Sequence, residues 1–450
     1  MTSTAATLAA PWAGLRLKPG FTISRFEGTP DERYLLEVGN TCYVLNPPMR
    51  ELVLALEEGP KDLAELAAIV RRRTGEAVSV EVLEDVLAKR LPAGIFADQP
   101  DEVPRKPFFV SFQLLSSRVL EPITRRLHWL FHPALAVAAV LAFLAVEALV
   151  LPQAVRRVQG GLDFVELAVL YLAIIASGLI HELGHATACS RFGAPHGGVG
   201  FGLYLFFPAF YADVTKAWRL PPRERAVVDL GGLYFQCFLM IPVGLLAWKS
   251  GHPFLLHLVW LINFMMLMTL NPILKMDGYW LLSDLSGLRN LHRLFAQTVV
   301  YWFGRLRGKG QKMARLAEIT GAKRWVLYAY SALALAYIGY LLPLGVAAVS
   351  GVVRNYPHKA QEVFSLLAAH FAQGEMAATL SSLGKLLNIS VWPAILGFIV
   401  MRLSFKLFRL LFVRLRSAVQ CLIKGLCHCH PAEQVSGTVA EKASNQQPIS

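Results

Sequence analysis

The sequence predicts a mostly α-helical protein, in which a polytopic membrane helical bundle of about five or six spans follows a small soluble N-terminal α+β domain. Three observations support this fold class. Only 17% of the residues are charged and 55% are hydrophobic, whereas soluble domains carry about 25% charged residues. Several apolar stretches reach the length of about 20 helical residues that crosses a bilayer. The first hundred residues instead show short amphipathic patterns.

Residues 1–100 predict a winged-helix-like domain, built from a β-hairpin, three amphipathic helices and a returning strand. The hairpin would turn at Gly39-Asn40, between two short runs of strand-forming residues. Asp62 and Ser79 are good N-caps for two of the helices. The expected strands are Arg33–Val38, Thr41–Leu45 and Gly94–Phe96, and the expected helices are Met49–Glu57, Asp62–Arg73 and Ser79–Arg90.

Residues 101–132 are expected to connect this domain to the membrane. A polar, proline-bearing linker ends near Pro107. The stretch Phe108–His132 then mixes apolar residues with Arg118, Arg125 and Arg126, which is typical of a helix that lies on a bilayer surface.

The membrane core is expected at residues 133–353. Its apolar stretches contain few charges, with Glu147 in the first and Asp229 in the third. Residues 354–415 would form an extracytoplasmic loop, a shorter last span near Ile389–Met401 and a basic surface helix, and residues 416–450 a polar cytoplasmic tail. The five expected main spans are Pro133–Leu151, Leu162–Ile180, Ala226–Trp248, Pro253–Leu274 and Val326–Val353.

The distribution of Lys and Arg predicts the orientation. If the N-terminus is cytoplasmic, most of the loop cations fall on the cytoplasmic side, as the positive-inside rule requires. The net charge of +13 is therefore attributed to topology and anionic lipid rather than to nucleic acid. We expect a multi-pass protein of the bacterial cytoplasmic membrane. The cysteines show no disulfide-framework spacing, and Cys427 and Cys429 lie in the tail.

The sequence His181-Glu182-Leu183-Gly184-His185 lies at the end of the second expected span. Residues four apart share a helix face, so the two histidines can present their imidazoles to one zinc ion. Glu182 can reach a metal-bound water as general base. Gly184 leaves room for a substrate backbone or a closely packed helix. Ionisable groups within membrane spans are costly, and this favours a functional site.

Asp277 is the best candidate for a third zinc ligand. It follows Asn271-Pro272 at the end of the fourth expected span and precedes Gly278. Pro272 would break the helix there, and Gly278 would permit a tight turn beside the ligand. An Asp-Gly pair alone is more typical of a simple turn, but the upstream HExxH motif favours a ligand.

Over residues 160–285 the sequence resembles the site-2-protease superfamily of intramembrane zinc metalloproteases, which combine HExxH with a later Asn-Pro…Asp-Gly motif. Phe207–Val214, Ala217–Pro221 and Asp277–Asp284 make it similar to the branch of peptide zinc metalloproteases. The resemblance implies one catalytic Zn²⁺ ion, bound by His181, His185 and Asp277, with Glu182 as base. It also implies that Asn271 holds the substrate or the developing oxyanion.

The stretch Gly198–Phe207 is too short and glycine-rich for a spanning helix, so we expect a re-entrant hairpin. An exposed strand edge around Gly200 and Gly202 could pair with an extended substrate. Plain packing of an interfacial loop is the alternative.

Two further polar residues fall within expected spans. Asp229 would orient a ligand histidine from outside the coordination sphere, or cap the start of its helix. Asn263 is expected to form a hydrogen bond between helices.

The first hundred residues resemble the PqqD-like domains, which bind leader segments of ribosomally made peptides. The hairpin Tyr34–Leu45, the Leu45-Asn46-Pro47 lead into a helix and Gly94–Phe96 carry the resemblance. It implies a domain that delivers a peptide to the membrane site. A purely stabilising or regulatory domain is the alternative.

Together these patterns predict a membrane-embedded zinc endopeptidase that cleaves a membrane-associated or recruited precursor peptide. The alternative is a non-proteolytic zinc-containing component of peptide maturation or export, with peptide-export proteins as partners. Acidic residues on the N-terminal domain argue against DNA binding, and the several His-rich boxes of a di-iron desaturase are missing.

Overall fold

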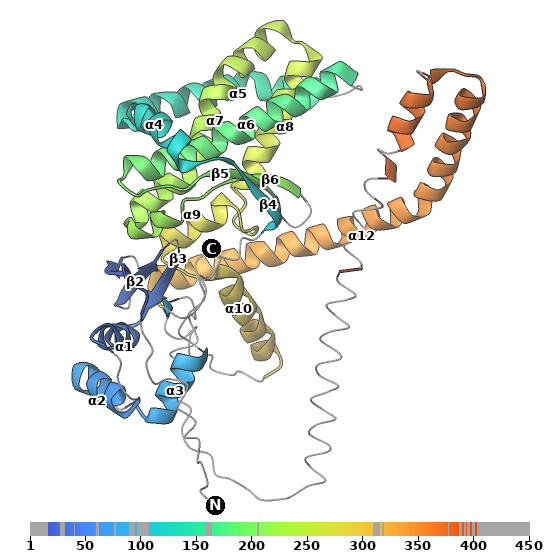
Figure 1. Ribbon diagram of the computed structural model, residues 1–450. Helices are drawn as coiled ribbons and strands as arrows, with labels where there is room; N and C mark the ends of the chain where they lie inside the picture. Colours follow the sequence, from blue (N-terminus) through green and yellow to red (C-terminus); the bar gives the residue numbers. More distant parts are fainter. Residues whose placement is uncertain are drawn as a thin grey trace, which may run out of the picture. The chain divides into compact units, whose positions relative to one another are not determined.

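The computed structural model describes residues 17–27, 32–39, 41–59, 63–75, 78–89, 95–96, 108–157, 164–204, 207–308, 316, 319–376 and 378–386, and isolated positions between 389 and 402. Over these residues the protein is mostly α-helical, as the sequence predicts (Figure 1). The chain divides into two compact units, with the boundary between Tyr328 and Ala329. The cysteine-containing tail lies outside the described residues.

The N-terminal domain begins with an antiparallel sheet of order β1-β2-β3. The predicted hairpin is confirmed: β2 (Arg33–Val38) pairs with β3 (Thr41–Leu45), and Val38 lies opposite Thr41. Gly39 has φ +59°, which only glycine adopts readily and which allows the tight connection. Strand β1 (Thr22–Phe26) was not predicted. Phe26 is its one buried residue, so the sequence TISRF lacks the alternating apolar pattern that indicates a strand.

Three helices complete this domain close to their predicted positions: α1 (Pro47–Glu57), α2 (Leu63–Thr74) and α3 (Val80–Lys89). The backbone N–H of Met49 donates to the side chain of Asn46 at 2.9 Å, which caps α1, and Pro47 follows at the first helical position. Of the expected last strand, Gly94 lies outside the described residues, and Phe96 forms an isolated antiparallel bridge with Leu17.

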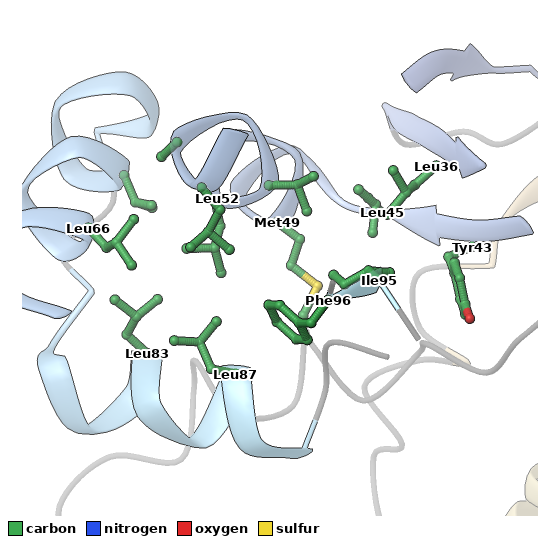
Figure 2. Packing of buried hydrophobic residues seen from close by; sticks show 14 of the residues in the cluster. Leu36, Tyr43, Leu45, Met49, Leu52, Leu66, Leu83, Leu87, Ile95 and Phe96 are labelled. Carbon is green, nitrogen blue, oxygen red and sulfur yellow. The ribbon is translucent and has the colours of Figure 1, made fainter. Parts of the chain in front are cut away.

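One apolar core lies between the sheet and the three helices (Figure 2). Leucines at helical spacing on α1, α2 and α3 meet strand residues there. Burying each such side chain contributes roughly 1.5–3 kcal/mol. The domain thus has a core of its own, made of Leu36, Leu45, Met49, Leu52, Leu66, Leu83, Leu87, Ile95 and Phe96 among others.

Among the described residues, four helices are long and apolar enough to cross a membrane: α5 (Pro133–Arg157), α6 (Phe164–Arg191), α7 (Pro222–Ser250) and α12 (Gly321–Ala372). Helix α8 (Pro253–Thr269) has 17 residues and ends before Asn271, short of the predicted end at Leu274. The expected sixth span near Ile389–Met401 falls mostly outside the described residues.

Helix α12 continues to Ala372, although a loop was expected from residue 354. The segment after Val353 contains Pro357 but is otherwise rich in helix-forming residues. The turn that ends it contains Gly374, which has φ +71° and so adopts the left-handed backbone common after a helix C-terminus.

A second three-stranded sheet, of order β4-β5-β6, lies beside the membrane helices (Figure 1). Its strands are β4 (Phe108–Leu115), β5 (Val199–Tyr204) and β6 (Phe207–Ala212). A hairpin is found where one was predicted, but it extends to Ala212: the stretch Gly198–Phe207 supplies β5 and only the first residue of β6. The prediction that an interfacial helix begins at Phe108 was wrong, because β4 pairs antiparallel with the distant strand β5. The helix of that region is α4 (Ser117–Leu127), which is followed by the short 3-10 helix η2 (His128–Phe131).

Helices α6 and α7 cross at glycine. A Cβ atom on Gly184 would lie 2.1 Å from the carbonyl oxygen of Gly231, so no larger residue fits this contact. Two shorter helices follow α8 in the chain, α9 (Asp277–Ser286) and α10 (Leu291–Leu306). Helix α9 packs against α7, and this packing brings its first residue toward α6.

Candidate metal centre

Three potential ligand atoms converge at the α6–α9 contact. His181 Nε2 lies 3.0 Å from Asp277 Oδ2 and 3.0 Å from His185 Nε2. His185 Nε2 lies 3.2 Å from Asp277 Oδ2. The structure thus brings together the three residues predicted as metal ligands.

This triangle has the size that a zinc ion requires. Zinc binds histidine nitrogen at 2.0–2.1 Å and carboxylate oxygen at 2.0–2.2 Å with tetrahedral geometry, so its ligand atoms lie about 3.3 Å apart. Each of the three residues offers one ligand atom, which leaves a fourth position for water, as in catalytic zinc sites. The donors present therefore fit a catalytic zinc ion.

The other ring nitrogen of each histidine has a protein partner. His185 Nδ1 lies 2.7 Å from the Val228 carbonyl oxygen, which can only accept, so Nδ1 carries the proton. His181 Nδ1 lies 3.0 Å from Gln236 Oε1, and Gln236 Nε2 donates to Ser177 Oγ at 2.9 Å. Both rings therefore direct an unprotonated Nε2 toward the site, which is the tautomer that a metal ligand needs.

Gln236 was missed in the sequence analysis. It is a buried polar residue inside the apolar stretch Ala226–Trp248, and a polar group in such a stretch is costly unless it has a partner. That signal could have identified the residue, but its partner could not be identified without the helix packing.

Two glycines leave the space that the helices carrying His181 and Asp277 need to pack closely around the site. A Cβ atom on Gly232 would lie 2.5 Å from the His181 ring, and one on Gly278 would lie 2.0 Å from the Leu270 carbonyl oxygen. Gly184 was predicted to lie against either a substrate backbone or a closely packed helix. Its neighbour in the structure is helix α7. Glycine at these positions lets α6, α7 and α9 meet around the site.

Glu182, the predicted base, is buried on α6 beside the ligands. Its carboxylate accepts a hydrogen bond from the backbone of Ala212, in β6. A Cβ atom on Gly178, one turn earlier in α6, would contact the Phe210 ring of β6. Strand β6 therefore lies directly beside the HExxH motif.

The edge of β5 is not free for a substrate. Gly200 pairs with Gln113 of β4 and with Tyr211 of β6. Gly202 is likewise placed between two partner strands. The expected open edge at Gly200 and Gly202 is thus wrong, because β4, far away in the sequence, occupies it. The outer strands of this sheet are β4 and β6.

Asn271 lies in the turn between α8 and α9. The Ile273 backbone N–H donates to its Oδ1 atom at 2.9 Å, so the side chain stabilises the turn that leads to Asp277. Its predicted contact with substrate stays a prediction.

Neither role predicted for Asp229 matches the structure. Helix α7 begins at Pro222 with Pro221 as N-cap, so Asp229 is not a cap. The Val228 carbonyl, one residue earlier, orients His185. Asp229 Oδ2 is buried without a hydrogen-bond partner among the described residues.

The prediction for Asn263 is confirmed: its Nδ2 donates to Glu147 Oε2 at 2.9 Å, which joins α8 to α5.

The curated relatives include a protein of Bacillus subtilis (strain 168) named "Putative peptide zinc metalloprotease protein YydH". It is 30% identical over 127 residues, which are 28% of this chain and 50% of that protein. The chain thus spans about half the length of this relative. No family model matches the sequence, and no solved structure matches it. The similarity supports a metalloprotease-like function in general, with zinc as the metal.

Proposed function

We propose that this protein is a membrane-embedded zinc-dependent endopeptidase of the site-2-protease type. The observation that carries the proposal is the convergence of His181 Nε2, His185 Nε2 and Asp277 Oδ2 within 4.8 Å of one another. Glu182, whose carboxylate could act as base, lies on α6 together with His181 and His185. The similarity to a protein named as a peptide zinc metalloprotease agrees with this assignment.

His181, His185 and Asp277 would hold the zinc ion. Bound there, zinc would act as a Lewis acid that makes a water nucleophilic at neutral pH. Glu182 would accept a proton from the attacking water on its carboxylate and donate it to the leaving amine nitrogen. Gln236 and the Val228 carbonyl, which contact the Nδ1 atoms of His181 and His185, would keep both imidazoles in the tautomer that a metal ligand needs.

The substrate segment would lie extended along β6. Proteolysis requires an extended backbone, and an outer strand can hold one by main-chain hydrogen bonds. Strand β6 is an outer strand of its sheet, and its Ala212 backbone contacts Glu182. Asn271 would help to hold the peptide where the turn approaches the site.

The substrate class that we propose is a membrane-associated or recruited precursor peptide, with the N-terminal domain, residues 1–100, binding its leader segment. The site would lie in the cytoplasmic half of a bacterial cytoplasmic membrane, with the N-terminus inside. This orientation is supported by the excess of Lys and Arg in the loops assigned to the cytoplasm.

The test is the Glu182→Gln variant, which keeps the size of the side chain but removes the base. Purified wild type and variant are incubated with the small precursor peptides encoded beside the gene, and cleavage is followed by mass spectrometry. We expect one zinc ion in both proteins and cleavage only by the wild type. Cleavage by Glu182→Gln would refute the mechanism. Zinc in the wild type without turnover of any such peptide would favour the non-proteolytic alternative.

A further inference from the structure

The N-terminal domain contacts the membrane core through an aromatic and cationic cluster that the proposed chemistry does not use. Phe26, at the end of β1, is only 4% exposed. Its ring lies 6.0 Å from that of Trp218, in the 3-10 helix η3 (Thr215–Arg219). The guanidinium groups of Arg225 and Arg289 lie over the Phe26 ring at 5.2 and 4.4 Å. We call Phe26, Trp218, Arg225 and Arg289 the Phe26 cluster.

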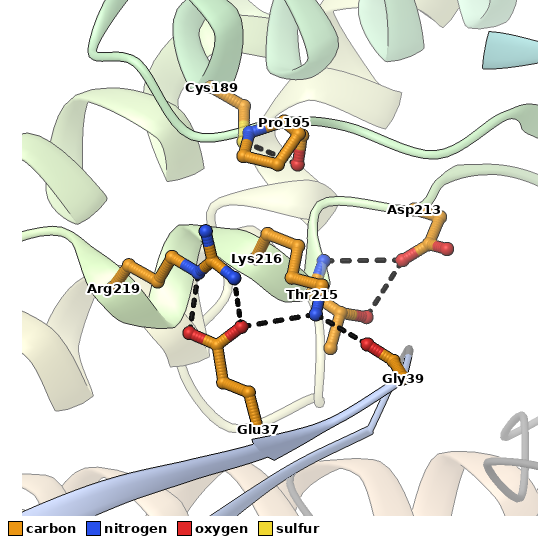
Figure 3. Close-up of polar contacts among 8 residues, drawn as sticks. All are labelled: Glu37, Gly39, Cys189, Pro195, Asp213, Thr215, Lys216 and Arg219. Carbon is orange, nitrogen blue, oxygen red and sulfur yellow. Dashed lines mark hydrogen bonds and ion pairs between the residues drawn. The ribbon is translucent and has the colours of Figure 1, made fainter. Parts of the chain in front are cut away.

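An ion-pair network joins Glu37 to Lys216 and Arg219 (Figure 3). Glu37, on β2, accepts hydrogen bonds from Arg219 and from Lys216 Nζ at 3.1 Å. Lys216 Nζ also donates to the Gly39 carbonyl at 2.7 Å. Glu37 is 5% exposed in its side chain, and a buried carboxylate without such partners would be strongly destabilising. The network is therefore a specific contact between β2 and η3.

Glu37 and Arg289 are both charged at neutral pH. Burial alone would raise the pKa of Glu37, but the hydrogen bonds from Arg219 and Lys216 outweigh burial and hold that pKa below its ordinary value. Burial, aided by the neighbouring Arg225, lowers the pKa of Arg289 to about 10, which still leaves the guanidinium protonated.

Two members of the Phe26 cluster also contact helix α9. The Trp218 ring lies 6.1 Å from the Trp280 ring, edge to face. Arg225 Nε donates to Asp284 Oδ2 at 2.9 Å, and both side chains are less than 10% exposed. Trp280 and Asp284 lie three and seven residues after Asp277 in the same helix, a spacing that places all three on one face.

We infer that the docked N-terminal domain positions α9, and hence the metal ligand Asp277, through Phe26 acting on Trp218 and Arg225. Phe26 lies against Trp218 and Arg225, and these two residues in turn contact α9. Without Phe26, Arg225 and Trp218 lose a partner and can move away from Asp284 and Trp280. Phe26, Trp218 and Arg225 are thus positioning residues, and domain docking and metal affinity are coupled. This inference rests on the proposed metal site.

The coupling is tested by breaking and restoring the Glu37 network in the full chain. Glu37→Arg places three cations together, and Glu37→Arg with Arg219→Glu restores an opposite-charge pair with exchanged positions. Glu57→Arg, at the exposed end of α1, makes the same charge change away from the interface. Cobalt(II) is titrated into each detergent-solubilised apoprotein, and its visible absorption reports both affinity and coordination geometry.

We expect Glu37→Arg to bind cobalt about tenfold more weakly, the low end of the range for groups that position metal ligands, with an altered spectrum. The double variant should recover, and Glu57→Arg should match the wild type. Unchanged affinity and spectrum in Glu37→Arg would overturn the inference, as would a folded double variant that stays weak. A wild type that binds no cobalt would instead refute the metal site itself.

Discussion

Asp277 Oδ2 lies 3.0 Å from His181 Nε2 although 96 residues separate the two in the sequence. This proximity depends on α9 packing against α7 and on α7 crossing α6 at Gly184 and Gly231. The short distance places Asp277 beside the two histidines, where a third metal ligand would lie, rather than in an isolated turn.

Asp277→Ala should therefore reduce zinc affinity about 100-fold, because it removes one of three protein ligands. Metal analysis of the purified variant after dialysis against a weak chelator measures this. An equal zinc content in variant and wild type would show that Asp277 is not a ligand. Asp213→Asn, which changes a carboxylate that hydrogen-bonds Thr215, serves as the control.

Gln236→Leu should lower metal affinity about tenfold, since the Nδ1 atom of His181 would lose its partner. The conservative variant Gln236→Glu keeps an acceptor there and should retain most of the affinity. Competition with a chromophoric zinc chelator measures both. If the Leu variant bound zinc as tightly as the wild type, Gln236 would have no positioning role.

Gly232→Ala should destabilise the protein by about 1–3 kcal/mol, as overpacking does, because the new methyl group would overlap the His181 ring. Gly339→Ala, in α12, meets no atom within 4 Å and should be neutral or slightly stabilising through helix propensity. Thermal unfolding in detergent compares the pair. Similar melting temperatures for both variants would contradict the packing described for α6 and α7.

Acid should weaken the contact between the N-terminal domain and η3. The folded-state pKa of Glu37 is below its ordinary value of 4.5, so its contribution to stability is fully present above that value. The contribution is lost as the pH falls through the folded pKa. Glu37→Gln lacks this titration, so its melting temperature should change less than that of the wild type between pH 6 and pH 3. Parallel curves for the two proteins would exclude a role for Glu37.

Local patterns predicted most of the secondary structure. The β2–β3 hairpin and helices α1 to α3 lie within a few residues of their expected bounds, because hydrophobic periodicity and capping residues are properties of neighbouring positions. Strand β4 was mistaken for helix, since its partner β5 begins more than 80 residues later in the sequence. Strand formation at Phe108–Leu115 depends on that distant partner.

The same distinction holds at the metal site. The spacing of His181 and His185 and the apolar length of α6 were sufficient to predict two ligands on one helix in a membrane protein. Asp277 could be named as a third ligand only together with the upstream motif. The residues that orient the ligands, Gln236 and Val228, depend on how α7 crosses α6, and so does the need for glycine at Gly232.

The sequence by itself predicted the long apolar helices, the N-terminal hairpin domain and the two histidines on one helix face, because each follows from residue types at short spacing. Only the tertiary structure decided that β4 closes the edge of β5, that α7 orients both histidines, and that Phe26 shares Trp218 and Arg225 with the helix of Asp277. These are contacts between segments far apart in the chain, and their geometry depends on the packing of whole helices rather than on any local pattern.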